Sequence, residues 1–319
     1  MFNICLIGFG NIGRRHFEAL LKLKFDVKIF LVDPYEQAFK NINDYSLTSN
    51  INVEFSHDYD FLPGNIDLAI IATSSSVRRM CFEKLVEKSI VKYIIFEKVL
   101  FQKIEDYDYV EDELNRRSIK ACVNCPRRLF DSYCFLRDEL SRDTIESIKI
   151  SGGNWGLGCN GIHMLDLISY LVYDVDLRVD TFTFGDQIFD SKRSGYKEFY
   201  GSIQGSNANN RFQFEISCDN SSDSLCITID TVNYRYVVCE KDNALTRTTK
   251  STNASILKKE FSIDYISDTT KKAVDDIICN GKCLLTSFTK SKEIHLKFIQ
   301  CILDYYGNKL GDKNICPIT

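Results

Sequence analysis

Short apolar runs recur through the first 124 residues and are separated by amphipathic stretches. The runs are continuous rather than alternating, which is typical of strands buried on both faces of a parallel sheet. Strands are predicted at Asn3–Ile7, Val27–Val32, Asn52–Phe55, Asp67–Ile71, Val91–Phe96 and Lys120–Val123. The intervening stretches Val77–Lys88 and Glu105–Arg117 are long enough for helices and are charged on one face. We therefore expect residues 1–124 to form a doubly wound parallel α/β domain.

The pattern changes beyond Pro126, where polar and apolar residues begin to alternate. Helices are predicted at Leu129–Leu140, Gly161–Tyr173 and Thr289–Tyr306, and strands at Lys197–Gly205, Arg211–Cys218, Ser224–Asp230 and Asn233–Cys239. The turn-forming segment Gly205–Asn210 predicts a hairpin between the first two of these strands. The last helix places Ile294, Phe298 and Ile302 on one stripe. Residues 125–319 are expected to form an α+β domain with an open, mainly antiparallel sheet and helices on one face.

Charge and hydropathy narrow the class of protein. The 319 residues carry a formal net charge of -4, and the basic pairs Arg14-Arg15 and Arg127-Arg128 are isolated, so a nucleic-acid-binding surface is not expected. The sequence begins directly with a strand pattern, and no apolar run approaches the roughly eighteen residues of a membrane span. A soluble, cytoplasmic protein is the expectation.

Thirteen cysteines are present, an odd number in a long chain. We expect reduced thiols that pack in the core rather than a disulfide framework. Cys122 with Cys125 and Cys279 with Cys283 form close pairs that raise the alternative of a zinc site. No histidine follows either pair at the spacing of a zinc finger, so no metal is predicted.

The first predicted strand runs directly into Gly8-Phe9-Gly10-Asn11-Ile12-Gly13, a Gly-x-Gly-x-x-Gly sequence that opens a helix from Asn11 to about Leu23. Gly8 permits a tight turn, Gly10 allows the backbone to approach a pyrophosphate, and Gly13 allows the helix to pack closely on the sheet. The N–H groups at the start of that helix suit phosphate oxygens. A glycine triplet alone is weak evidence, but a preceding strand, a following helix and a later acid strengthen it.

That acid is Asp33, which ends the second strand twenty residues beyond Gly13 and would accept the ribose hydroxyls. Glu36 adds a second carboxylate, and the segment Asp33-Pro34-Tyr35-Glu36 contains no cation that would attract a 2′-phosphate. Repulsion between like charges favours NAD over NADP, although Lys40 lies near in sequence.

Glu97 and Lys98 follow the buried strand Val91–Phe96 directly, so they emerge at the carboxyl end of the sheet. Spacing alone favours an ordinary surface pair. The order of strand, glycine loop, Asp33, Ala72-Thr73-Ser74, Glu97-Lys98, Arg127-Arg128 and His163 resembles the Gfo/Idh/MocA oxidoreductases over nearly the whole chain. The resemblance implies an N-terminal Rossmann domain in which the glycine loop, Asp33, Ala72, Thr73, Ser74, Glu97 and Lys98 bind the cofactor, with Lys98 also acting on the substrate hydroxyl. Val99 stands where the family usually has proline.

His163 lies in the segment Gly158-Cys159-Asn160-Gly161-Ile162-His163, and helical spacing places Asp166 and Tyr170 on its face. A lone helical histidine is more often structural, but this one matches the family's glycine-rich segment that ends in histidine. Cys159 replaces the aspartate that the family commonly carries four residues earlier, which puts the usual relay of Lys, Asp and His in doubt. A free lysine has a pKa of about 10.4 and a free histidine about 6.5, so the pKa of His163 needs the smaller shift for proton exchange near neutral pH. The resemblance implies that Lys98 is the acid/base, with a larger role for His163 when the aspartate is absent.

Substrate contacts are predicted at Arg127, Arg128, Trp155, Asn160 and Asp166. Either arginine could bind a carboxylate or phosphate, or be an ordinary surface charge. Trp155 could stack on a sugar or fill the domain junction. The resemblance implies an NAD-dependent oxidoreductase acting on a CH–OH group of a sugar, nucleotide sugar or sugar acid.

Two alternatives stay open at this point: the reduction of a different ketone or imine, such as an amino-acid or tetrapyrrole-like substrate, and a nucleotide-sensing regulator that has kept the cofactor domain and lost turnover. A homodimer or homotetramer through the C-terminal sheet is expected, because a half-covered sheet needs something on its other face.

Overall fold

The computed structural model describes residues 1–173, 176–207, 211–252 and 254–319. The chain divides into two compact units, each described by itself below. Unit 1 contains Met1–Pro126 and Tyr265–Lys292, and unit 2 contains Arg127–Asp264 and Glu293–Thr319. The segment Tyr265–Lys292 lies in the range that the sequence assigned to the second domain.

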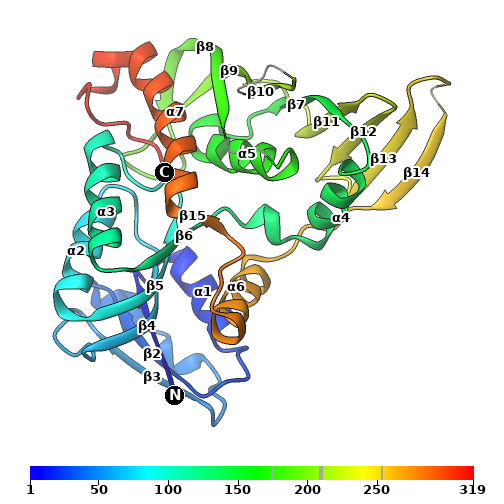
Figure 1. Cartoon of the computed structure of the whole chain (residues 1–319). Coiled ribbons are helices and arrows are strands. Elements are labelled where there is room, and N and C mark those ends of the chain that lie inside the picture. The colour runs from blue at the N-terminus through cyan, green and yellow to red at the C-terminus, as the bar shows by residue number, and fades with distance from the viewer. Residues whose placement is uncertain (174–175, 208–210, 253) are drawn as a thin grey trace. The chain divides into compact units, whose positions relative to one another are not determined.

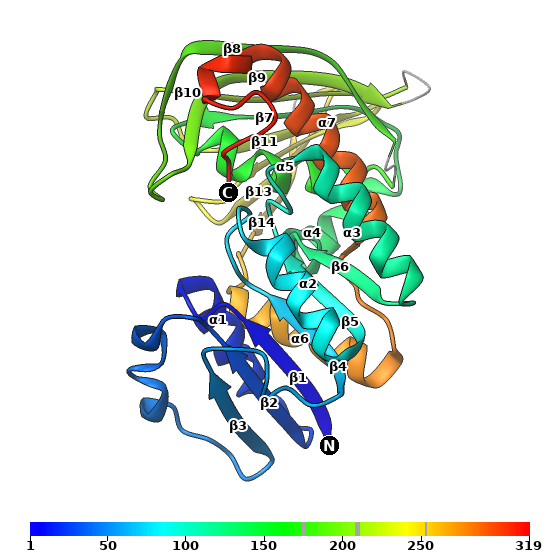
Figure 2. The same cartoon turned by 90° about the vertical axis from the view of Figure 1, so that its left-hand side faces the viewer.

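Unit 1 is built on a sheet with the strand order β15-β6-β5-β4-β1-β2-β3 (Figures 1 and 2). The strands are β1 (Phe2–Ile7), β2 (Val27–Val32), β3 (Ile51–Ser56), β4 (Asn65–Ile71), β5 (Ile90–Glu97), β6 (Lys120–Asn124) and β15 (Thr286–Ser287). All pairs are parallel except β15 with β6. The predicted parallel, doubly wound domain is confirmed, and the bounds of its predicted strands differ by at most two residues from those observed.

Helices cover both faces of this sheet. They are α1 (Asn11–Leu20), α2 (Arg78–Lys88), α3 (Ile104–Arg116) and α6 (Ile266–Asn280). Right-handed crossovers place α1, between β1 and β2, on the face opposite α2 and α3, because the strand order runs in opposite directions from β1 and from β4. α6 packs beside α1 (Figure 1), so a helix from late in the chain completes this face.

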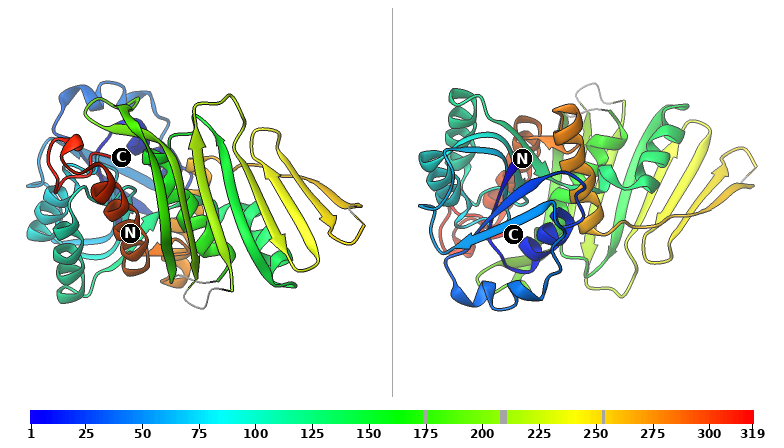
Figure 3. Two further views of the ribbon diagram at one scale, coloured as in Figure 1. Left: turned by 90° about the horizontal axis from the view of Figure 1, so that it is seen from above. Right: turned by 90° about the horizontal axis from the view of Figure 1, so that it is seen from below.

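Unit 2 contains the second sheet, with the order β14-β13-β12-β11-β7-β10-β9-β8 (Figure 3). Its strands are β7 (Ile145–Gly153), β8 (Leu177–Asp190), β9 (Lys197–Asn207), β10 (Gln213–Asp219), β11 (Cys226–Thr231), β12 (Tyr234–Cys239), β13 (Ala244–Thr249) and β14 (Ser255–Glu260). Among the described strands of this second sheet, only β7 and β10 pair in parallel, so the predicted mainly antiparallel sheet is confirmed. β9 and β10 pair as the hairpin prediction required, while residues 208–210 of its turn lie outside the described residues.

The remaining helices are α4 (Asp131–Leu140), α5 (Leu157–Leu171) and α7 (Phe288–Tyr306). α5 packs against β9 and β10. The predicted stripe of α7 is buried, and its Phe298 approaches α5 so closely that a Cβ on Gly161 would lie 2.7 Å from the ring. The boundary between the two units falls within α7. Across the described residues, none of the helices is both long enough and apolar enough to span a bilayer.

Candidate cofactor-binding and active-site residues

The glycine loop has the geometry that its sequence predicts. Gly8 has a φ of +90°, and a Cβ there would lie 3.1 Å from the Ala72 backbone. A Cβ on Gly13 would overlap the Gly8 carbonyl oxygen, whereas Gly10 has open space around its Cβ position. Among the described residues no side chain caps the N-terminus of α1, so its first N–H groups suit an anionic ligand.

Asp33 is bonded to this loop. One of its carboxylate oxygens accepts the Phe9 N–H at 2.7 Å, and the other accepts the Tyr35 N–H at 3.0 Å. Its residue exposure is 7%, but each carboxylate oxygen retains acceptor capacity for a ribose hydroxyl. The structure thus brings the predicted acid and the predicted phosphate loop together within unit 1.

Arg14 is a residue whose location the sequence did not reveal. From α1 it donates to the carbonyl of Ala38, which lies in the short 3-10 helix Glu36–Phe39 just after Asp33. Its guanidinium also lies 4.8 Å from the centre of the Phe9 ring. A cation is therefore present near the segment where the sequence showed only carboxylates, and helical position alone does not disclose it.

The Ala72-Thr73-Ser74 segment follows β4 and lies beside the glycine loop. The Ala72 N–H donates to the Ile7 carbonyl at 2.8 Å. The buried Arg78 donates to the carbonyl oxygens of Thr73, Val99 and Leu100. Arg78, which sequence reasoning also missed, therefore joins the loops that follow β4 and β5.

Glu97 and Lys98 lie at the carboxyl end of β5, as predicted. The Lys98 side chain is half-buried, and the Lys98–Val99 peptide bond is cis. Glu97 is 7% exposed and accepts hydrogen bonds from His16 and Asn124. Burial alone would raise the pKa of Glu97, but the hydrogen bonds from His16 and Asn124 and the charge of Arg78 outweigh it, so the pKa lies below its ordinary value. Glu97 is consequently an ionised, buried carboxylate.

In unit 2, the segment around His163 is organised by Glu198 of β9. The Glu198 carboxylate accepts the N–H groups of Gly158 and Cys159, both at 2.8 Å, and so caps α5. This cap explains why α5 begins at Leu157, earlier than the predicted start at Gly161. His163 lies in the second turn of α5 and is half-buried.

Glu198→Ala is expected to lower the free energy of unfolding by about 1–3 kcal/mol, because two N–H groups at the start of α5 lose their acceptor. Glu198→Gln, which retains one acceptor oxygen, should fall between the parent and the alanine variant. Urea unfolding of the three proteins measures the series. Equal stability of all three would show that the cap contributes nothing.

Trp155 and Asn160 have partners within the same segment. The Trp155 indole N–H donates to the Ser217 carbonyl at 2.9 Å, and the Asn160 side-chain amide donates to the Trp155 carbonyl at 2.6 Å. The indole is half-buried. These bonds hold the two residues beside the start of α5, and their predicted contact with substrate stays a prediction.

Both predicted substrate-binding arginines form bidentate ion pairs with carboxylates of unit 2. Arg127 donates two hydrogen bonds to Glu240, each 2.9 Å long, and Arg128 donates to Asp166 at 2.9 and 3.1 Å. Tyr133 also donates to Glu240, at 2.6 Å. The planar groups that were expected to bind an anionic substrate are thus bound to protein carboxylates, one of them the predicted site residue Asp166.

Burial alone would raise the pKa of Glu240, but the charge of Arg127 and the hydrogen bonds from Arg127 and Tyr133 place it below its ordinary value. A lowered folded-state pKa gives stability that is present above the unfolded pKa of about 4.3 and is lost as pH falls through the folded pKa. Glu240→Gln is therefore expected to cost about 3 kcal/mol at pH 7, and clearly less near pH 3.

Urea unfolding at both pH values tests this prediction. Glu54→Gln is the control, because Glu54 is an exposed carboxylate whose ion pair with Lys28 should change stability little at either pH. A Glu240→Gln penalty that does not depend on pH would contradict the prediction.

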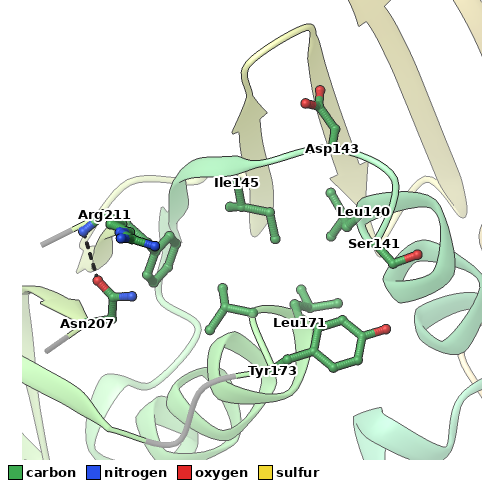
Figure 4. A pocket seen from close by; sticks show the side chains of 10 residues that line it. Leu140, Ser141, Asp143, Ile145, Leu171, Tyr173, Asn207 and Arg211 are labelled. Carbon is green, nitrogen blue, oxygen red and sulfur yellow. Dashed lines mark hydrogen bonds between the residues drawn. The ribbon is translucent and has the colours of Figure 1, made fainter. Parts of the chain in front are cut away.

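Unit 2 contains a hollow of about 390 Å³. Figure 4 shows it with Asn207 and Arg211 at one end and Leu140 and Ser141 at the other. Another hollow, of about 440 Å³, is lined by Lys149, Thr181, Gln204 and Glu215 on the sheet. The residues that line these hollows include none of the predicted site residues. The homo-oligomer expected through this sheet stays a prediction.

In the described part of the chain, no disulfide joins the cysteines and no three histidine, cysteine or acidic side chains are grouped to hold a metal ion. Cys125 is buried, whereas Cys279, of the second close pair in sequence, is exposed.

Comparison with solved structures shows that this fold is shared over nearly the whole chain. A super-repressor mutant of Gal80p from Saccharomyces cerevisiae is 15% identical with a TM-score of 0.73, and covers 98% of this chain and 97% of its own. An oxidoreductase from Agrobacterium radiobacter in complex with NAD+, L-tartaric acid and magnesium is 15% identical with a TM-score of 0.74, covering 94% of each chain.

The UDP-N-acetylglucosamine 3-dehydrogenase GnnA from Acidithiobacillus ferrooxidans is 12% identical with a TM-score of 0.69, and covers 94% of this chain and 96% of its own. Among curated protein sequences, none matches this chain. Residues 2–124 match the model of an oxidoreductase family with an NAD-binding Rossmann fold. This match, to the Gfo/Idh/MocA oxidoreductases, covers the N-terminal Rossmann domain of the chain.

Proposed function

We propose that this chain is an NAD-dependent oxidoreductase that interconverts a secondary alcohol and a ketone. The observation that carries the proposal lies within unit 1, where β1, β2 and β5 of one parallel sheet lead into Gly8, Asp33 and Lys98. The carboxyl ends of parallel strands share one edge, which is where open α/β sheets bind ligands. The hydrogen bond from Phe9 to Asp33 links the phosphate loop to the ribose-binding acid at this edge.

NAD is the proposed cofactor rather than NADP. The buried Asp33 carboxylate would repel a 2′-phosphate, and the exposed Glu36 adds a second negative charge nearby. Arg14 is the cation that could oppose them, but it already donates to the Ala38 carbonyl and lies against the Phe9 ring.

Lys98 is the proposed acid/base. Bound NAD would supply the hydride acceptor, at C4 of its nicotinamide, for a hydride from the substrate carbon. The Lys98 amine would accept the proton of the substrate hydroxyl in the oxidation direction and return it in reduction. His163 is proposed as a second proton-handling group, which follows from the family resemblance and from Cys159 in place of aspartate.

The proposed substrate is a sugar, a nucleotide sugar or a sugar acid. This class follows from the family resemblance, and the likeness to a UDP-N-acetylglucosamine 3-dehydrogenase agrees with it. Both proposed substrate contacts lie beside the start of α5: Trp155 would stack on the substrate, and Asn160 would make polar contacts with it.

Absorbance at 340 nm tests the proposal. NAD with a panel of sugars, nucleotide sugars and sugar acids should show sustained NADH formation with at least one member, and NADH with the matching ketone should show the reverse. Failure of every substrate in both directions, by a protein that binds NADH, would overturn the proposal.

A second candidate is a regulator that binds cofactor and ligand without turnover. The observations that favour it are Cys159 at the position of the family's aspartate and the structural likeness to Gal80p, of which the solved form is a super-repressor mutant. Calorimetry with the same panel separates the two candidates, because the regulator would bind a ligand tightly without any change in absorbance.

A further inference from the structure

Four buried polar side chains from four elements of unit 1 form one hydrogen-bonded network. They are His16 on α1, Glu97 on β5, Asn124 on β6 and Thr270 on α6. Their exposures are 1%, 7%, 5% and 3%, respectively. The His16 Nε2 atom lies 2.9 Å from Glu97, its Nδ1 atom lies 2.8 Å from the Thr270 hydroxyl, and the Asn124 amide donates to Glu97 at 2.5 Å.

The partners in this network are chemically complementary. An imidazole whose Nε2–H donates to the carboxylate presents Nδ1 as an acceptor for the Thr270 hydroxyl. The backbone just beyond Lys98 is held separately by the Arg78 guanidinium, which donates to the Val99 and Leu100 carbonyls. The chain on both sides of Lys98 is therefore held by side-chain hydrogen bonds in the interior.

Such a network is not needed for packing alone. Apolar residues of similar volume often replace buried ionic groups without loss of stability, whereas a half-satisfied network is costly. The position of the network in the fold suggests a functional role. Glu97 directly precedes Lys98, and His16 lies on the helix that begins at the glycine loop.

We propose that His16 is a positioning residue that, through Glu97, fixes the backbone of Lys98 relative to α1 and so to the bound cofactor. This inference rests on the proposed function, in which Lys98 is the acid/base. Catalytic groups are sensitive to such placement, since a shift of about 1 Å can lower a rate about 10²-fold. Thr270 acts one step further away, by holding the His16 ring.

The test compares His16→Leu, which removes both bonds, with His16→Gln, whose amide can still donate to Glu97. We expect kcat to fall by about 10²-fold in His16→Leu and by no more than about tenfold in His16→Gln, with the Kd for NADH within about threefold of the parent in both. Thr270→Val should lower kcat by about three- to tenfold. Its matched control is Thr269→Val, because the neighbouring Thr269 hydroxyl donates along α6, to the Ile266 carbonyl, and kcat should not change.

A readout independent of turnover is the rate at which trinitrobenzenesulfonate labels Lys98, followed by peptide mass spectrometry with and without NAD. Lys98 labelling should change in His16→Leu and Thr270→Val but not in Thr269→Val, while labelling of the exposed Lys92 stays constant. If the parent turns over no substrate, the proposed function fails and labelling alone decides the inference. Unchanged kcat or unchanged labelling in folded His16→Leu would overturn it; if that variant does not fold, the pair Thr270→Val and Thr269→Val decides in the same way.

Discussion

Lys98→Met is expected to lower kcat by about 10³-fold or more while the Kd for NAD stays within a few-fold of the parent, because the amine that exchanges the substrate proton is lost. Methionine retains the length and the apolar stem of lysine, so the loop after β5 keeps its packing. Steady-state kinetics on the substrate found in the 340 nm assay, together with NADH fluorescence titration, measures both quantities.

Lys92→Met is the matched control, since Lys92 lies on the same strand in an exposed ion pair with Asp67. Its kcat should equal that of the parent. If Lys98→Met kept turnover within a few-fold while His163→Ala abolished it, the two residues would exchange roles, and His163 would be the principal acid/base.

Gly13→Ala is expected to abolish NAD binding and to lower the free energy of unfolding by about 3 kcal/mol or more. The added Cβ would overlap the Gly8 carbonyl oxygen, and a backbone atom cannot rotate away as a side chain can. α1 would have to move off the glycine loop, which displaces both the phosphate site and His16. Urea unfolding and NADH titration measure the two effects.

Gly10→Ala and Gly64→Ala are the controls, because a Cβ at either position meets no atom within 4 Å. Both should retain the stability of the parent, but Gly10→Ala should weaken NAD binding if the pyrophosphate approaches that backbone. Normal NAD binding by Gly13→Ala would show that the close contact between α1 and the loop can relax.

Much of unit 1 was predictable because its signals are local. The strands β1, β2, β4 and β5 are mostly continuous apolar runs, which is typical of strands covered on both faces. Asp33 and Lys98 could be placed at one edge of the sheet because the carboxyl ends of parallel strands share that edge, while the family resemblance singled out Lys98 for a role in the site. The conformation of the glycine loop could be predicted because each glycine in it satisfies a steric constraint set by nearby residues.

The ion-pair partners of charged residues were less predictable. The sequence shows Arg127 and Arg128 as an isolated basic pair, yet their partners are Glu240 and Asp166, 113 and 38 residues away. The positions of charged residues along the chain do not show which distant carboxylate will pair with a given arginine in the folded protein. For the same reason Arg14 was considered only as part of a basic pair, and its approach to Ala38 went unseen.

The sequence by itself determined the strands of the Rossmann sheet, its glycine loop and the positions of Asp33 and Lys98 at its edge, because period, glycine spacing and strand ends are properties of neighbouring residues. Only the tertiary structure decided that α6 completes unit 1 and that Thr270 meets His16, 254 residues earlier. The physical reason is burial: polar groups withdrawn from water must find partners wherever the packing of helices brings them, and sequence separation places no limit on that choice.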